Sequence, residues 1–204
     1  MREIAPGLHH WTARHPKIGF EVSSYFIADS ATLLDPMEPP DVGMAWFRGD
    51  REPRAIVLTN RHHDRDSARY CAEFGIQPVL VPEAGLHEFE DKDLEVAGYV
   101  PGEEVVPGIV VHEVGALAPD DMALEIRSVG ALALADGLVH FEDGVRFVRD
   151  SYMDDPENTK RGLERALDEL LDLDFDTLLF AHGEPIVGGG KQVLRDFLAA
   201  RRAE

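Results

Sequence analysis

Residues 53–74 of the chain read PRAIVLTNRHHDRDSARYCAEF and join a strand, a polar loop and a helix. Residues 55–58 are an unbroken apolar run, which is typical of a strand buried on both faces. Residues 67–74 have the amphipathic spacing of a helix. The loop between them, residues 59–66, is crowded with side chains that can bind a ligand or a metal. Because α/β proteins place their chemistry at such loops, we predict a functional site here; a polar connection with two incidental histidines is the alternative.

The loop resembles the metal-binding loop of the metallo-β-lactamase superfamily, whose signature is His-x-His-x-Asp-His directly after a strand and a threonine. Thr59 takes the place of that threonine, and His62 and Asp64 match the second histidine and the aspartate. Asn60 stands where the first histidine belongs, and Arg65 where the last one belongs. The resemblance therefore implies the fold of the superfamily and only part of its metal site.

Two later segments resemble the superfamily in the expected chain order. The apolar run 131–134 leads into Asp136, like the strand-Gly-Asp element whose aspartate bridges two metals, although Asp-Gly is also a common hairpin turn. The buried strand predicted over residues 175–180 ends in Ala-His-Gly-Glu-Pro, which resembles the Gly-His-Gly-x-Pro motif. That context makes His182 the most specific match in the chain.

Two further positions bear on the site. The superfamily's third metal histidine belongs in a turn near residues 115–121, where Ala116 or Leu117 stands in its place, so that histidine is absent. Asp35 ends an early strand and precedes a proline, as does an aspartate that supports the metal loop in the superfamily. A plain turn former is an equal reading of Asp35.

The resemblance covers nearly the whole chain, so we expect residues 1–204 to form a single domain. The expected fold is a four-layer αββα metallo-β-lactamase-like sandwich of the α/β (α+β) class. Strands 55–58 and 75–82 should form a βαβ unit around the 67–74 helix. Another helix is predicted over residues 156–173 from its apolar face.

On the 67–74 helix, Ala68, Cys71 and Ala72 are predicted to share the buried side, and Phe74 is a further candidate for it. Cys71 is the only cysteine of the chain, which excludes an intrachain disulfide. A small buried hydrophobic side chain is a better interpretation of it than a nucleophile.

Composition restricts the partners. The net charge is -19, with 39 acidic and 20 basic side chains, which argues against nucleic acid or an anionic membrane. There is no basic segment followed by an apolar run at the start, so we expect a soluble cytoplasmic protein. The expected partner is a small-molecule substrate or ligand. A homodimer is also possible from the resemblance, because members of the superfamily often form dimers.

The resemblance implies a reduced metal site formed by His62, Asp64, Asp136 and His182, with His62 and Asp64 also catalytic. Two histidines and two aspartates suit one Zn, Fe or Mn ion with room for water. Such an ion would lower the pKa of water and polarise a carbonyl or phosphoryl oxygen, which is hydrolase chemistry.

Arg65 argues for a metal-free site. At about 4 Å and an effective dielectric constant of about 20, a guanidinium repels each unit of metal charge by about 4 kcal/mol. Arg65 would instead pair with Asp64 or Asp136 and replace the metal by a salt bridge. Asn60, His63 and Arg65 are then candidate ligand-binding residues, and whether His62 or His63 faces the cleft stays open.

Three hypotheses follow. The first is a metal-dependent hydrolase of a small ester, thioester or lactone, with at most one metal ion. The second is a metal-free, inactive relative that binds an anionic small molecule or partner through Arg65, His62 and His182. The third is a protein that keeps only the scaffold, because a fold alone does not choose a function.

Overall fold

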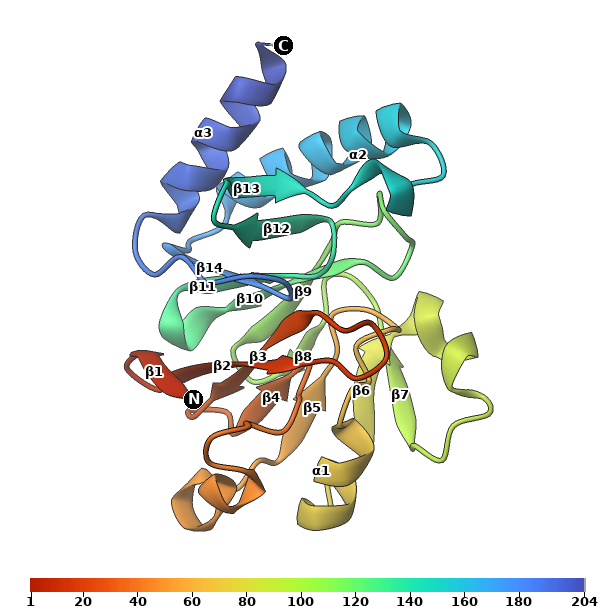
Figure 1. The fold of residues 1–204 in the computed structure, drawn as a ribbon, viewed down its shortest axis with the longest axis vertical. Helices are drawn as coiled ribbons and strands as arrows, with labels where there is room; N and C mark the ends of the chain where they lie inside the picture. The colour runs from red at the N-terminus through yellow and green to blue at the C-terminus, as the bar shows by residue number, and fades with distance from the viewer. Residues whose placement is uncertain (204) are drawn as a thin grey trace.

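Two β-sheets pack face to face with helices on their outer faces, so the chain is a four-layer αββα sandwich (Figure 1). The computed structural model describes residues 1–203. The predicted fold class is confirmed, and the colours of Figure 1 show that the first half of the chain builds one sheet with its helices and the second half the other.

The seven-stranded sheet has the strand order β1-β2-β3-β4-β5-β6-β7. Its strands are β1 Arg2–Ala5, β2 Leu8–Arg14, β3 Glu21–Ile27, β4 Thr32–Leu34, β5 Ala55–Val57, β6 Val79–Pro82 and β7 Val96–Tyr99. The strands from β1 to β4 pair antiparallel and those from β4 to β7 pair parallel. Helix α1 (Ser67–Phe74) connects β5 to β6, which confirms the predicted βαβ unit.

The five-stranded sheet has the order β14-β11-β10-β9-β8, and a separate hairpin pairs β12 with β13. These strands are β8 Glu104–Val106, β9 Ile109–Glu113, β10 Met122–Ile126, β11 Ala131–Leu134, β12 Leu138–Phe141, β13 Gly144–Phe147 and β14 Thr177–Phe180. The outer helices are α2 (Pro156–Glu169) and α3 (Gly190–Arg202). Short 3₁₀ helices are η1 Met44–Phe47, η2 Gly49–Arg51, η3 Glu83–Phe89, η4 Arg127–Val129, η5 Asp150–Tyr152 and η6 Leu170–Asp172.

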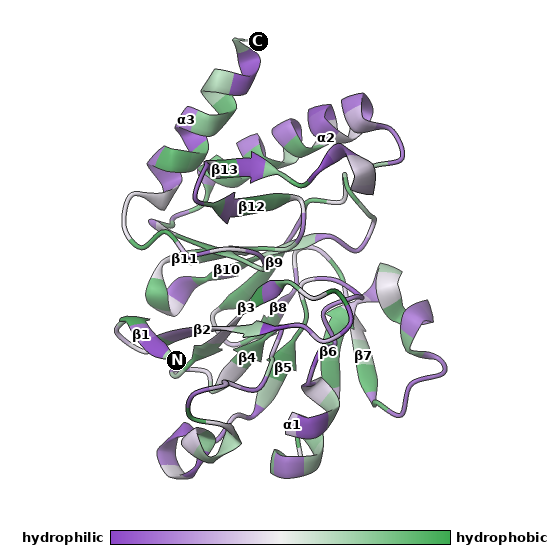
Figure 2. Ribbon diagram, in the orientation of Figure 1, coloured by the Kyte–Doolittle hydropathy of each residue, from purple (hydrophilic) through white to green (hydrophobic). Residues whose placement is uncertain are grey.

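Three apolar clusters hold the layers together, and Figure 2 shows the strands of both sheets as largely hydrophobic. The cluster between the sheets includes Leu34, Val111 and Leu124, all fully or nearly fully buried. The second joins the five-stranded sheet to α2 and α3, and the third joins the other sheet to α1. Each such buried side chain contributes about 1.5–3 kcal/mol relative to exposure.

The buried face of α1 differs from the prediction. Ser67 and Tyr70 are buried, whereas Ala68 and Ala72 are exposed and Cys71 is half-buried. Tyr70 is fully buried because its ring packs against aromatic neighbours in the third cluster and its hydroxyl donates to a backbone carbonyl 3.1 Å away. An aromatic ring with a satisfied hydroxyl gains more from burial than two alanine methyl groups.

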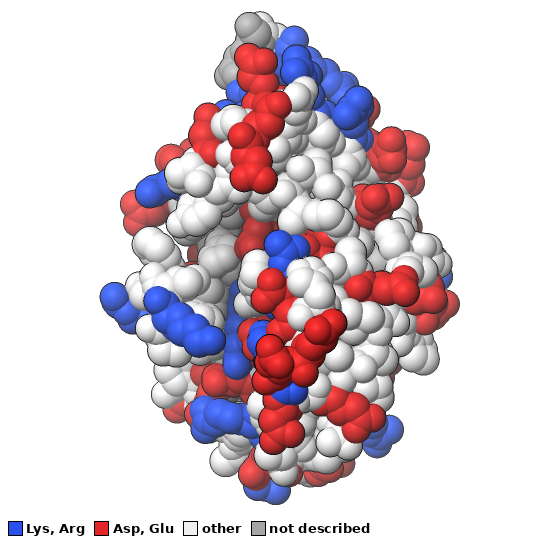
Figure 3. Space-filling view, turned by 90° about the vertical axis from the view of Figure 1, so that its right-hand side faces the viewer, with Lys and Arg blue, Asp and Glu red and all other residues white. Residues whose placement is uncertain are grey.

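The surface carries charges of both signs. On the face drawn in Figure 3, acidic and basic side chains are interspersed, and a hollow lies at mid-height between the two halves of the molecule. Among the described residues, no helix combines the length and the apolar character that crossing a membrane requires.

Candidate metal centre

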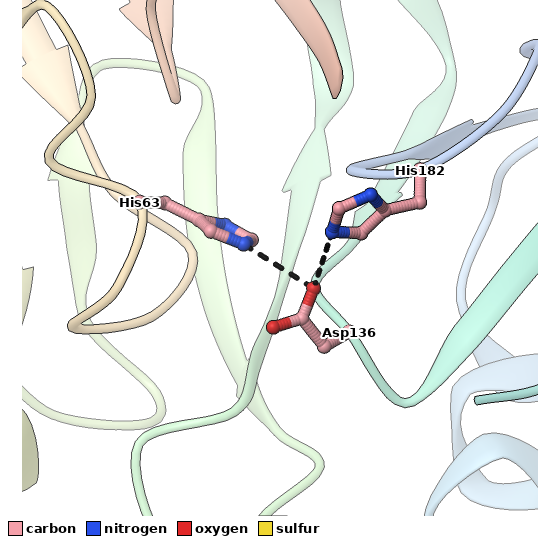
Figure 4. Close-up of side chains that lie close together, drawn as sticks. All are labelled: His63, Asp136 and His182. Atoms are coloured by element: carbon pink, nitrogen blue, oxygen red, sulfur yellow. Dashed lines mark ion pairs between the residues drawn. The ribbon is translucent and has the colours of Figure 1, made fainter. Parts of the chain in front are cut away.

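Three side chains that can bind a metal ion lie close together where strands of the two sheets end. His63 lies in the loop after β5, Asp136 follows β11 and His182 follows β14. Strands β11 and β14 pair parallel, so their carboxyl ends lie at the same edge, and β5 of the other sheet delivers its loop to that edge. The three side chains point toward one another from separate loops (Figure 4).

The ligand atoms of these three residues all lie within 4.8 Å of one another. Asp136 Oδ1 is 3.2 Å from His63 Nε2 and 3.1 Å from His182 Nε2. His63 is 4% exposed, whereas the side chains of Asp136 and His182 are 25% and 21% exposed. The cluster is therefore closed on the His63 side and open to solvent on the His182 side.

The donor set fits a small divalent metal ion. Despite the short distances, neither imidazole meets the geometry of a hydrogen bond to Asp136 Oδ1, which is buried and has no hydrogen-bond partner. Atoms that bind a tetrahedral ion at 2.0–2.1 Å lie about 3.3 Å apart, close to both distances measured here. Two imidazoles and a carboxylate suit Zn, Fe or Mn.

His63 is fixed from behind by Asp35. The Nδ1 atom of His63 lies 2.9 Å from Asp35 Oδ2, and Asp35 Oδ1 accepts a 2.8 Å hydrogen bond from the Thr59 backbone N–H. The Thr59 hydroxyl also donates to Asp35 Oδ2, at 2.6 Å. A carboxylate on Nδ1 holds the proton there and leaves the Nε2 lone pair for a metal, as in carboxylate–histidine–metal arrangements.

Charges in the metal-free cluster are strongly coupled. Burial alone would lower the pKa of His63, but the carboxylates of Asp35 and Asp136 outweigh it and raise that pKa to about 9. Burial likewise opposes ionisation of Asp136, yet His63 and then His182 hold its pKa well below the usual range. A proton on His63 therefore balances the buried carboxylates where no metal does so.

Two of the predicted ligands, His62 and Asp64, lie outside this cluster. His62 is exposed, because a tight turn closed by the His63 N–H on the Asn60 carbonyl points neighbouring side chains in different directions. The Asp64 carboxylate turns away from the cluster to an ion pair with Lys92 Nζ at 2.7 Å. His63 takes the place beside Asp136 and His182 that the sequence assigned to His62.

Arg65 also differs from the prediction. Its Nη1 donates to the backbone carbonyls of Ser23 and Asp35, the latter at 2.7 Å, instead of pairing with Asp64 or Asp136. Its Nη2 is buried without a hydrogen-bond partner. The guanidinium therefore links strand ends of the seven-stranded sheet, and within residues 1–203 it does not replace a metal by a salt bridge.

Residues 115–121, where the resemblance places a third metal histidine, provide carboxylates that brace the site. Asp120 Oδ2 accepts a 2.8 Å hydrogen bond from the Arg61 N–H and pairs with its guanidinium. Asp121 Oδ1 accepts one at 3.1 Å from the Asp136 N–H. Burial, and then the Asp136 carboxylate, raise the pKa of Asp121 to about 8. No local motif in the sequence marks these contacts.

The loop that carries His182 is held by residues the sequence left without a role. The Ser23 hydroxyl donates to the Gly183 carbonyl at 2.7 Å, and His10 Nε2 lies 3.1 Å from that hydroxyl. Gly183 has φ +101°, and a Cβ there would lie 1.5 Å from the His140 carbonyl oxygen. Only glycine fits at this position.

No protein-family model and no curated protein matches the sequence, but solved structures match its fold. A metallo-β-lactamase family protein of Thermus thermophilus aligns over 98% of this chain and 81% of its own, with 19% identity and a TM-score of 0.69. The DIM-1 metallo-β-lactamase aligns over 99% of this chain and 96% of its own, with 13% identity and a TM-score of 0.74. This chain has the metallo-β-lactamase fold.

The metallo-β-lactamase fold does not by itself assign chemistry. The rubredoxin oxygen:oxidoreductase of Desulfovibrio gigas also aligns, with 15% identity and a TM-score of 0.68, over 97% of this chain and 60% of its own. A β-lactamase and an oxidoreductase thus share the fold, so the function has to be argued from the site.

Proposed function

We propose that this chain is a metal-dependent hydrolase of the metallo-β-lactamase superfamily with a mononuclear site made by His63, Asp136 and His182. The proposed substrate is a small ester, thioester or lactone. The observation that carries the proposal is the convergence of two imidazole nitrogens on the buried Asp136 Oδ1, which has no hydrogen-bond partner. Three protein ligands with one open position are typical of a catalytic zinc site.

The side chains have distinct proposed roles. His63, Asp136 and His182 would hold the ion, with His63 and His182 offering Nε2 and Asp136 offering Oδ1. Asp35 keeps the His63 proton on Nδ1 and so keeps Nε2 free for the ion. A bound Zn, Fe or Mn ion would lower the pKa of a water molecule and polarise an oxygen atom of the substrate. A small molecule would reach the site from the side of His182, where the cluster is exposed to solvent.

A second candidate is a metal-free relative that binds an anionic small molecule. The raised pKa of His63 favours it, because an imidazolium stabilises the buried carboxylates without a metal. Of the residues predicted to bind such an anion, Arg65 donates through Nη1 to two backbone carbonyls and its Nη2 is buried, while His62 is exposed. The partly exposed His182 and the protonated His63 are then the groups available to it.

Hydrolysis by metal-loaded protein tests the first candidate. Protein stripped with a chelator and reloaded separately with Zn, Fe(II) or Mn(II) is assayed on nitrophenyl esters, thioesters and lactones. We expect turnover with at least one metal, a loss of about 100-fold or more in His182→Ala, and no loss in His87→Ala, whose side chain is exposed. Absence of turnover with every metal, together with a thermal shift by phosphate or acetate, would favour the second candidate.

A further inference from the structure

Asn60 occupies the position where the resemblance places a metal-binding imidazole, and its buried amide makes three hydrogen-bond contacts. The residue is 5% exposed. Its Oδ1 accepts from the His62 backbone N–H at 2.9 Å, and its Nδ2 donates to Asp136 Oδ2, also at 2.9 Å. The same Nδ2 lies farther, 3.4 Å, from His63 Nε2. Because a backbone N–H can only donate, the oxygen of the amide must face it, and the NH₂ group must face the carboxylate.

The two oxygens of Asp136 are thereby made unequal. Oδ2 is occupied by the Asn60 amide, while Oδ1 faces the nitrogens of His63 and His182. The backbone of Asp136 is held as well, because its N–H donates to Asp121 Oδ1. The carboxylate can turn only by breaking the bond to Asn60.

We propose that Asn60 is a positioning residue that makes Asp136 a one-oxygen metal ligand. This inference rests on the proposed function, because it concerns how the same site binds its ion. With Oδ2 engaged, the protein supplies two nitrogens and one oxygen, which favours a four-coordinate ion with a single open position. With Oδ2 free, the carboxylate could bind through both oxygens and raise the coordination number, as carboxylates do with larger ions.

The substitution Asn60→Ala removes the hydrogen bonds to Asp136 and to the His62 N–H and the longer contact with His63. Asn158→Ala is the matched control because it changes the chain's other asparagine, on α2. Two quantities are measured on folded protein: the Kd for Zn by competition with a chromophoric chelator, and the visible spectrum of bound Co(II). The d–d bands of Co(II) are stronger in four-coordinate than in five- or six-coordinate sites. We expect Asn60→Ala to bind Zn about 10–100-fold more weakly and to show weaker, shifted bands, with Asn158→Ala like the wild type.

Asn60→Asp is the second variant, and it serves if Asn60→Ala does not fold. It keeps an oxygen to accept from the His62 N–H and replaces the donor that faces Asp136 by a carboxylate oxygen, which cannot hold Oδ2 by a hydrogen bond. An altered Co(II) spectrum is expected, and a wild-type spectrum would overturn the inference.

The outcomes separate the inference from the proposed function. If the wild type binds Zn and Co(II) and Asn60→Ala matches it in both Kd and spectrum, Asn60 is not a positioning residue while the metal site stands. If the wild type binds neither ion, the proposed metal site fails and the inference fails with it.

Discussion

His10 shows how a residue outside the cluster supports it. The side chain is 2% exposed, and its Nε2 lies 3.1 Å from the Ser23 hydroxyl, which in turn donates to Gly183 beside His182. Burial, followed by the charges of Arg2 and of the N-terminal amine, lowers the pKa of His10 from 6.5 to about 4. The folded protein therefore holds this imidazole neutral.

This depressed pKa predicts a pH dependence of stability. As the pH falls below 6.5, the unfolded chain takes up a proton on His10 that the folded protein excludes until about pH 4. The stability contributed by neutral His10 is complete above pH 6.5 and is lost toward pH 4, by about 3 kcal/mol in total. Urea unfolding of the wild type and of His10→Gln at pH 7.5 and pH 4.5 measures it. The loss between the two pH values should be smaller in the variant; equal losses would contradict the assignment.

At the scale of elements, α1 shows which part of a helix holds the sheet. Tyr70 is fully buried and lies 5.4 Å, centroid to centroid, from Phe47 in a T-shaped contact. Ala68 and Ala72 are exposed on the other side. The helix therefore attaches through Ser67 and Tyr70, with the partly buried Cys71 and Phe74 packed beside them.

Substitutions on the two sides of α1 should differ in cost. Tyr70→Ala is expected to lower the free energy of unfolding by about 3–5 kcal/mol, as for other large aromatic side chains removed from a core. Ala72→Ser, on the exposed side, should change it by less than about 0.5 kcal/mol. Chemical denaturation measures both. If Ala72→Ser lowered the free energy of unfolding more than Tyr70→Ala, the side of α1 with Ala68 and Ala72 would be the buried one.

The elements that sequence reasoning located best were those with long apolar runs. Strands β5, β11 and β14, with the loops that follow them, stand where the sequence predicted them, because each run is bounded by polar or turn residues. Which side of α1 is buried could not be predicted from the sequence. In a helix of eight residues, Cys71 belongs both to the predicted side with Ala68 and Ala72 and to the side that is buried with Ser67. Periodicity cannot rank such faces, because the packing partners are supplied by the tertiary fold.

The sequence could not predict whether His62 or His63 faces the cluster, for a similar reason. Both are histidines in one loop, and the direction of each depends on contacts made by distant segments. Asp35 holds His63 from β4, and Lys92 draws Asp64 away from the other side. The sequence offered Asp35 as a support for the loop but not which histidine it would hold, and nothing in the local pattern indicates the contact of Asp64 with Lys92.

At the scale of the whole molecule, the candidate centre lies on the seam between the two sheets. His63 follows a strand of the seven-stranded sheet, while Asp136 and His182 follow strands of the five-stranded sheet. A metal ion held by all three would connect the two halves of the sandwich. The cluster is thus both the proposed site of chemistry and a bridge between sheets.

The most direct test of this account is the metal content of the protein, purified without chelator and measured by plasma mass spectrometry. His62→Ala and His63→Ala form a matched pair, because the two histidines are neighbours and only His63 lies in the cluster. His182→Ala replaces His63→Ala if that variant does not fold. We predict about one Zn, Fe or Mn ion per chain in the wild type and in His62→Ala, and loss of the ion in His63→Ala. Metal-free wild type after soaking with these ions, or metal lost in His62→Ala and kept in His63→Ala, would contradict the account.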